Sequence, residues 1–133
     1  LGNDRRLVDL PGYGYAKVTE AKQRHWADTL GEYLLSRASL AGLILLMDVR
    51  HPLKEYDRNM VHWCTGAELP VYVILNKADK LSRGKAGASL LEVKKQLAEF
   101  PIEGIQLFSA LKRTGVDEAL QQLCRWLDLP YNK

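Results

Sequence analysis

Four short apolar runs, separated by segments with helical spacing, constrain the fold of this chain more than any other feature. The runs lie at about 6–10, 43–48, 71–76 and 105–109, and their cores are rich in leucine, isoleucine and valine without polar alternation. Strands of this kind are typical of sheets that helices cover on both faces. The alternation of strand and helix therefore predicts an α/β fold of parallel βαβ units with right-handed crossovers.

Four helices are predicted from the spacing of apolar residues, at about 20–36, 54–65, 88–100 and 115–127. Thr114 could cap the last of them. The apolar side of that helix would consist of Val116, Leu120, Leu123 and Leu127. A small, basic, glycine-rich stretch at 82–87 is expected to be a connection, either solvated or in contact with RNA phosphates.

The sequence Asn76-Lys77-Ala78-Asp79 follows the third apolar run directly. A carboxylate at the end of a strand can accept two parallel hydrogen bonds from a base edge that carries N1–H and an exocyclic amine. Guanine offers that pair of donors and adenine does not, so Asp79 could discriminate between the two purines. Asn76 would brace the loop, and the aliphatic stem of Lys77 could cover the face of the base. The alternative is a solvated loop after a strand.

A second motif, Asp9-Leu10-Pro11-Gly12, follows the first apolar run. In a nucleoside triphosphatase the aspartate of D-x-x-G reaches the magnesium ion, usually through a water molecule. The glycine lets a backbone N–H approach the terminal phosphate because no Cβ stands in the way. The alternative is a Pro-Gly turn that happens to follow an aspartate.

A third motif, Phe108-Ser109-Ala110, ends the fourth apolar run, and its small residues would let a backbone N–H point at the guanine carbonyl oxygen. Ser-Ala alone carries little information. The three motifs together carry more, because each ends a predicted strand. Ligands of open α/β sheets bind outside the carboxyl ends of the strands, so all three motifs would face one crevice.

The net charge and the cysteine content are compatible with several classes of protein. The net charge of +3 suits a protein that approaches RNA, but it also suits many enzymes that bind phosphates. Cys64 and Cys124 belong to no C-x-x-C pair, and we expect reduced thiols in a cytosolic protein, with neither a zinc site nor a disulfide. The longest apolar run, near 40–47, is far shorter than the roughly 20 residues that cross a bilayer.

Four segments of the chain carry a family resemblance. They are Val-Asp-Leu-Pro-Gly-Tyr-Gly-Tyr-Ala at 8–16, Leu-Met-Asp-Val-Arg-His-Pro-Leu at 46–53, Asn-Lys-Ala-Asp-Lys-Leu at 76–81, and Phe-Ser-Ala-Leu-Lys with Thr-Gly-Val within 108–116. They resemble the P-loop GTPases of the translation-factor class and, more narrowly, the bacterial ribosome-assembly GTP-binding proteins of the EngB type. The resemblance extends from Arg6 to Leu127.

The resemblance implies a three-layer α/β/α fold of the Ras-like P-loop type with a mostly parallel sheet. It implies GTP or GDP and Mg²⁺ as ligands, with Asp9 at the metal. The implied partner is the pre-ribosomal large subunit or its RNA, without DNA or a membrane, in the cytoplasm. The implied role is a switch in assembly of the large ribosomal subunit, which normal cell division and septation require.

One element of the resemblance is missing, because no G-x-x-x-x-G-K-[ST] occurs in the sequence. In the family, this phosphate loop and a switch threonine precede D-x-x-G in the sequence. The strand that leads to the loop lies in the middle of the sheet. We therefore expect residues 1–133 to be a single GTP-binding domain that is incomplete at its N-terminus. Alone, the chain should be inactive and marginally stable, or should borrow contacts from another chain.

No residue of the chain is assigned a catalytic role. Tyr13 stands where related GTPases have a glutamine that orients the attacking water, and a phenol is a poor substitute for that amide. We therefore expect slow hydrolysis that the ribosome or a bound cation accelerates. Two other readings remain open at this point: a non-catalytic interaction module that has lost nucleotide hydrolysis, and an unrelated α/β enzyme with fortuitous motifs.

Overall fold

The computed structural model describes residues 5–8, 32 and 40–132 of the 133-residue chain. Contacts divide the chain into two units, Leu1–Ser39 and Leu40–Lys133. In the first unit, the predicted strand at 6–10 is not borne out where it is described, because residues 6–8 have no regular structure. The predicted helix at 20–36 lies outside the described residues, apart from the helical Glu32.

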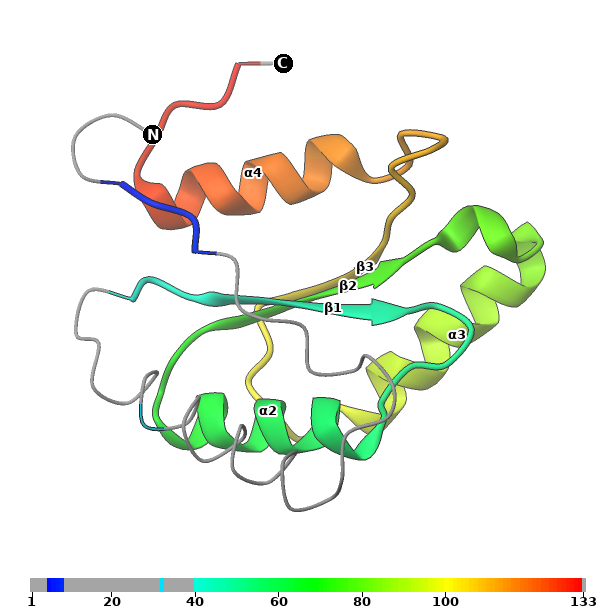
Figure 1. The fold of residues 1–133 in the computed structure, drawn as a ribbon, viewed down its shortest axis with the longest axis horizontal. Helices are drawn as coiled ribbons and strands as arrows, with labels where there is room; N and C mark the ends of the chain where they lie inside the picture. The colour runs from blue at the N-terminus through cyan, green and yellow to red at the C-terminus, as the bar shows by residue number, and fades with distance from the viewer. Residues whose placement is uncertain (1–4, 9–31, 33–39, 133) are drawn as a thin grey trace. The chain divides into compact units, whose positions relative to one another are not determined.

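The second unit is built on a parallel sheet of three strands, in the spatial order β1 (Leu43–Asp48), β2 (Val71–Asn76) and β3 (Gly104–Leu107). β1 and β2 pair in register along their whole length, from Leu43 opposite Val71 to Asp48 opposite Asn76. Their loops therefore emerge side by side at the carboxyl edge of the sheet (Figure 1).

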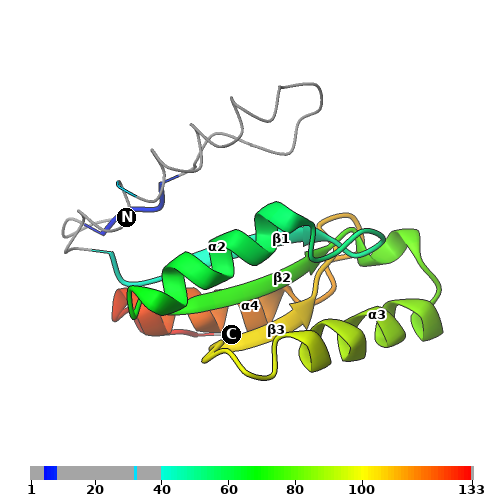
Figure 2. The same cartoon turned by 90° about the horizontal axis from the view of Figure 1, so that it is seen from below.

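Helices lie on both faces of this sheet. α2 (Glu55–Gly66) and α3 (Arg83–Gln96) cover one face, and α4 (Val116–Leu127) covers the other (Figures 1 and 2). A short 3-10 helix, η1 (Ala78–Lys80), follows β2. The predicted three-layer α/β/α fold with a parallel sheet is thus confirmed in the described part of the chain.

The start of α3 corrects the prediction of a connection at 82–87. The helix begins at Arg83, and the hydroxyl oxygen of Ser82 caps it by accepting a hydrogen bond of 3.3 Å from the backbone N–H of Lys85. Gly84 and Gly87 favour a loop on the sequence alone, but both lie inside the helix with nothing within 4 Å of an added Cβ. The N-terminal cap therefore outweighs the low helix propensity of glycine.

α4 also differs from its prediction, because Gly115 and not Thr114 precedes it. Gly115 has a φ of 75°, and no side chain caps the helix. A Cβ there would lie 2.3 Å from the carbonyl oxygen of Leu107, so the position requires glycine. The fully buried residues of α4 are Ala119 and Gln122. Of the predicted apolar side, Val116, Leu123 and Leu127 are half-buried, whereas Leu120 is 43% exposed, so that prediction is correct only in part.

The core between the sheet and α4 consists of Tyr72, Ile74 and Ala119, with Ile44, Phe108 and Trp126 packed against it.

Burial distinguishes the middle strand from its neighbour. Residues 71–75 of β2 are all buried, as expected for a strand covered on both faces. In β1, which is an edge strand among the described residues, Leu46 is 56% exposed, so the same expectation fails there. β2 has a strand on either side in the described sheet, whereas β1 has a neighbour on one side only.

Both cysteines are free thiols, as predicted. Cys64 is buried, and this burial raises the pKa of its thiol to about 11. Among the described residues, no helix is both long enough and apolar enough to pass through a bilayer.

Candidate functional site

Two of the three predicted motifs meet at the carboxyl edge of the sheet. The backbone N–H of Phe108 donates to the carbonyl of Leu75 (2.9 Å), and the N–H of Ala78 donates to the carbonyl of Phe108 (3.0 Å). These bonds prolong the pairing of β2 and β3 beyond the strand ends. They hold the loop at 76–79 against the turn at 108–110, as the shared crevice of the sequence analysis requires.

The first half of the β2 loop is braced by its own side chain. The Oδ1 atom of Asn76 accepts a hydrogen bond of 2.9 Å from the backbone N–H of Lys77. Lys77 has φ 61° and ψ 35°, a left-handed conformation that costs a residue with a Cβ about 1–2 kcal/mol. Strain of this kind persists where surrounding contacts impose it, and it concentrates at functional sites.

Asp79 is oriented by a buried serine. The Ser109 hydroxyl donates to Oδ1 of Asp79 at 2.7 Å, and the Oγ atom of Ser109 accepts from the backbone N–H of Lys112 at 3.1 Å. Ser109 is fully buried. Because its single hydroxyl proton goes to Asp79, the direction of this hydrogen bond is fixed.

The electrostatics of Asp79 favour an ionised acceptor. The hydrogen bond from Ser109 is the main reason that the pKa of Asp79 is lowered from its ordinary value, and Lys80 and Lys112 add to the effect. In the part of the chain that the structure describes, Ser109 is the one side chain that donates to this carboxylate. The carboxylate therefore retains accepting capacity for a ligand with two adjacent donors.

Of the two small residues in the turn after β3, Ala110 is the one whose backbone N–H remains available. Ser109 exchanges two backbone hydrogen bonds of 3.0 Å with Thr114, so its own N–H is occupied. Ala110 is exposed, and its N–H has no backbone acceptor among the described residues. If a carbonyl oxygen binds beside Asp79, the available donor is Ala110.

A buried network behind this turn was missed in the sequence analysis. The Tyr72 hydroxyl donates to Oε1 of Gln106 at 2.5 Å, and Nε2 of Gln106 donates to the carbonyl of Gly115 at 2.8 Å. Gln106 is only 4% exposed, so it ties β2 and β3 to the start of α4 from inside the core. A glutamine within an apolar strand was the available signal, because buried polar groups need partners.

In the loop after β1, Arg50 pairs with Asp48. The guanidinium approaches the carboxylate to 2.7 Å, and the Nζ atom of Lys77 lies 3.8 Å from the same carboxylate oxygen. His51, in the same loop, is exposed. The loops after β1 and β2 are therefore in contact through charged side chains.

The remaining predicted site residues, Asp9, Leu10, Pro11 and Gly12, lie outside the described residues. The assignment of Asp9 to magnesium accordingly stays a prediction. Within residues 5–8, 32 and 40–132, no three histidine, cysteine, aspartate or glutamate side chains gather as a metal site would require.

Structural comparison shows which fold the chain shares with solved proteins. The chain is similar to translation elongation factor SelB from Methanococcus maripaludis in its apo form, with a TM-score of 0.69, 20% identity, and coverage of 93% of this chain and 25% of that one. The same factor in complex with the GTP analogue GppNHp matches with a TM-score of 0.61 and 17% identity over 80% of this chain and 24% of that one. The fold is that of a P-loop GTPase domain.

Sequence comparison is more specific. The probable GTP-binding protein EngB of Methylobacillus flagellatus is 52% identical over 131 residues, which are 98% of this chain and 63% of that protein. The probable EngB proteins of Methylococcus capsulatus and Colwellia psychrerythraea are 51% and 46% identical, over 98% and 96% of this chain and 63% and 58% of theirs. No family model matches the chain. The chain is therefore similar to EngB-type GTP-binding proteins over nearly its whole length, and it spans about three fifths of the length of these curated relatives.

Proposed function

We propose that the protein to which this chain belongs is a guanine-nucleotide switch that binds GTP and GDP with Mg²⁺ and hydrolyses GTP slowly. The observation that carries the proposal is the ionised Asp79, which buried Ser109 aims at the carboxyl edge of the sheet. A fixed carboxylate with a spare oxygen matches the two donors of the guanine edge. The names of the relatives, probable GTP-binding proteins, support the same ligand.

Each motif has a separate task in this proposal. Asp79 accepts from guanine N1–H and the exocyclic amine, while the Ala110 N–H donates to the guanine carbonyl oxygen. The stem of Lys77 covers the face of the base. At the phosphate end, Asp9 holds magnesium through water and the Gly12 N–H approaches the terminal phosphate.

Hydrolysis is proposed to be slow because Tyr13 stands in place of a water-orienting glutamine. An accelerating group then comes from the ribosome or from a bound cation. Single-turnover measurements on the full-length protein, with and without ribosomal particles, test this step. Turnover of tens per second by the protein alone would contradict the role given to Tyr13.

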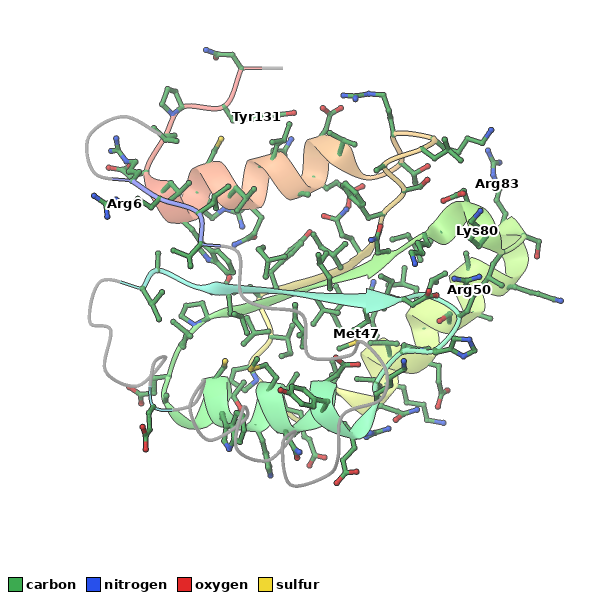
Figure 3. The ribbon with its side chains drawn as sticks, in the orientation of Figure 1. Arg6, Met47, Arg50, Lys80, Arg83 and Tyr131 are labelled. Atoms are coloured by element: carbon green, nitrogen blue, oxygen red, sulfur yellow. The ribbon has the colours of Figure 1, made fainter. Side chains whose placement is uncertain are left out.

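The proposed partner is the pre-ribosomal large subunit, in the cytoplasm, with a role in subunit assembly on which cell division and septation depend. Exposed basic side chains at the carboxyl edge of the sheet support an RNA partner, including Arg50, Lys80 and Arg83 (Figure 3). Co-sedimentation of the full-length protein with large-subunit precursors, in the presence of GTP or GDP, tests the partner. Binding that does not depend on the nucleotide would contradict a switch.

One experiment separates this proposal from its alternatives. GTP and ATP compete for displacement of a fluorescent guanine nucleotide from the full-length protein, and we expect displacement by GTP alone. Equal displacement by both would favour an unrelated α/β enzyme. No binding at all would favour a non-catalytic interaction module, which the absence of G-x-x-x-x-G-K-[ST] from these 133 residues also suits.

A further inference from the structure

The carboxylate of Asp48 lies between two cations at the boundary of the candidate site. Its Oδ1 atom accepts from the backbone N–H and the Nε of Arg50, at 2.9 and 3.0 Å. Its Oδ2 atom accepts from the second guanidinium nitrogen at 2.7 Å and lies 3.8 Å from Nζ of Lys77. Arg50 therefore fixes the plane of the carboxylate and leaves Oδ2 facing the lysine.

The backbone places this carboxylate beside the β2 loop with little freedom. Asp48 is paired in register with Asn76, and the N–H of Val49 donates to the carbonyl of Asn76 at 2.9 Å. The hydrogen bonds of Arg50 hold the pKa of Asp48 far below its usual range, so the group remains an anion throughout the pH range of biology. Asp48 is thus a permanent, positioned negative charge next to Lys77.

Lys77 is held at both ends. Its backbone is fixed by the hydrogen bond to Asn76 Oδ1 and by its left-handed conformation, and its ammonium group is attracted by Asp48. A free lysine side chain samples many rotamers and loses that freedom when it packs against a ligand. Anchoring of the ammonium before the ligand arrives reduces this loss, although 56% exposure of the lysine side chain keeps the attraction modest.

We propose that Asp48, oriented by Arg50, is a positioning residue that holds the Lys77 side chain extended beside the loop, so that its stem is ready to lie against the face of a purine base. This inference rests on the proposed function. In this proposal Asp48 increases the affinity for the nucleotide, whereas Asp79 discriminates between guanine and adenine. Asp48 acts through Lys77 in this proposal and makes no contact of its own with the nucleotide.

The test is a double-mutant cycle in the full-length protein, with fluorescent GDP as the probe. Asp48→Asn should weaken GDP binding by about two- to fivefold, and the preference for GTP over ATP should not change. Lys77→Met keeps the aliphatic stem and removes the charge. In the Lys77→Met background, Asp48→Asn should have no further effect, because the anchor no longer has a partner.

A conservative variant and a stability measurement complete the design. Asp48→Glu keeps the charge and should bind more tightly than Asp48→Asn, and thermal unfolding confirms that each variant is folded. The inference is overturned if Asp48→Asn has no effect, if its effect persists in the Lys77→Met background, or if it changes the preference for GTP over ATP. If the unaltered protein does not bind fluorescent GDP, the proposed function fails as well, so the two failures are distinguishable.

Discussion

Asp48 ends β1, and Asp79 lies in η1, just after the neighbouring parallel strand β2, yet the two carboxylates have opposite surroundings. Both oxygens of Asp48 face cations of the protein, Arg50 and Lys77. Asp79 receives one hydrogen bond from the buried hydroxyl of Ser109, which orients it and leaves accepting capacity. If Asp79 binds a ligand as proposed, the contrast is between a carboxylate that one buried hydroxyl orients and that can still accept, and a carboxylate whose oxygens are already occupied by cations of the protein.

Among the substitutions that test this contrast, Asp79→Ala should reduce the affinity for GDP the most. Two hydrogen bonds to a charged acceptor disappear, so GDP binding by the full-length protein should weaken by about 100-fold or more. Asp48→Ala, the matched control, should remain within about tenfold of the unaltered protein. Fluorescent-nucleotide titration measures both, and equal losses would show that the two aspartates do not differ in role.

Asp79→Asn should change which base is preferred. The Ser109 hydroxyl donates toward residue 79, so the amide should turn its oxygen to Ser109 and its NH₂ group outward. That group matches the 2-carbonyl of xanthine and opposes the amine of guanine, and we expect preference to shift toward xanthosine nucleotides by about tenfold or more. Competition between GDP and XDP measures the shift, and a variant that still prefers GDP would contradict the assigned role of Asp79.

Ser109→Ala removes the partner that orients Asp79 and leaves the Lys112 N–H without its acceptor. The affinity for GDP should fall by about tenfold because the carboxylate must then be ordered by the ligand itself. The preference for guanine should remain, since both Asp79 oxygens are still acceptors. Ser109→Thr, which keeps the hydroxyl, serves as the control, and an unchanged affinity in Ser109→Ala would show that the buried serine is dispensable.

The smallest effect concerns pH. Because the pKa of Asp79 is lowered in the folded protein, the ionised acceptor is present at neutral pH and is lost only as the pH falls through that lowered value. GDP affinity should therefore be constant near neutrality and decline in acid. Ser109→Ala should move the midpoint of this decline upward, because Ser109 is the main cause of the lowering. An unmoved midpoint would assign the decline to another group.

The protonation of Asp48 can be compared with that of Asp79 as the pH falls. Its carboxylate is held ionised by the paired guanidinium of Arg50, and its pKa is lowered more strongly than that of Asp79. As the pH falls, Asp79 should protonate before Asp48. Carboxyl carbon shifts measured by NMR would report both groups, and the opposite order would contradict the contrast between them.

The strands of the second unit were predictable because their apolar runs are continuous. The limits of β1 and β2 agree with the expected ranges 43–48 and 71–76. The runs end at polar residues, Asp48 and Asn76, which the carboxyl edge of a sheet accommodates. β3 ends at Leu107, sooner than predicted, because Ser109 turns to pair with Thr114.

The site was predictable as a set of loops but not as a set of contacts. The short-range pair of Asp48 and Arg50 could be inferred from spacing. The bond between Ser109 and Asp79 joins residues far apart in the chain, and Ser-Ala is too common a dipeptide to indicate it. The start of α3 departs from its prediction at Gly84 and Gly87 because helix propensity considers each residue alone, whereas the Ser82 side chain caps the helix there.

The outer edge of β1 has a practical consequence for anyone who purifies these 133 residues. Among the described residues, β1 pairs only with β2. The backbone N–H and C=O groups on the edge of β1 that faces away from β2 can therefore pair with a strand of another molecule, next to the exposed side chain of Leu46. Edges of this kind recruit further copies when protein is concentrated. If copies associate through this edge, light scattering should rise with protein concentration and should fall in the Leu46→Lys variant.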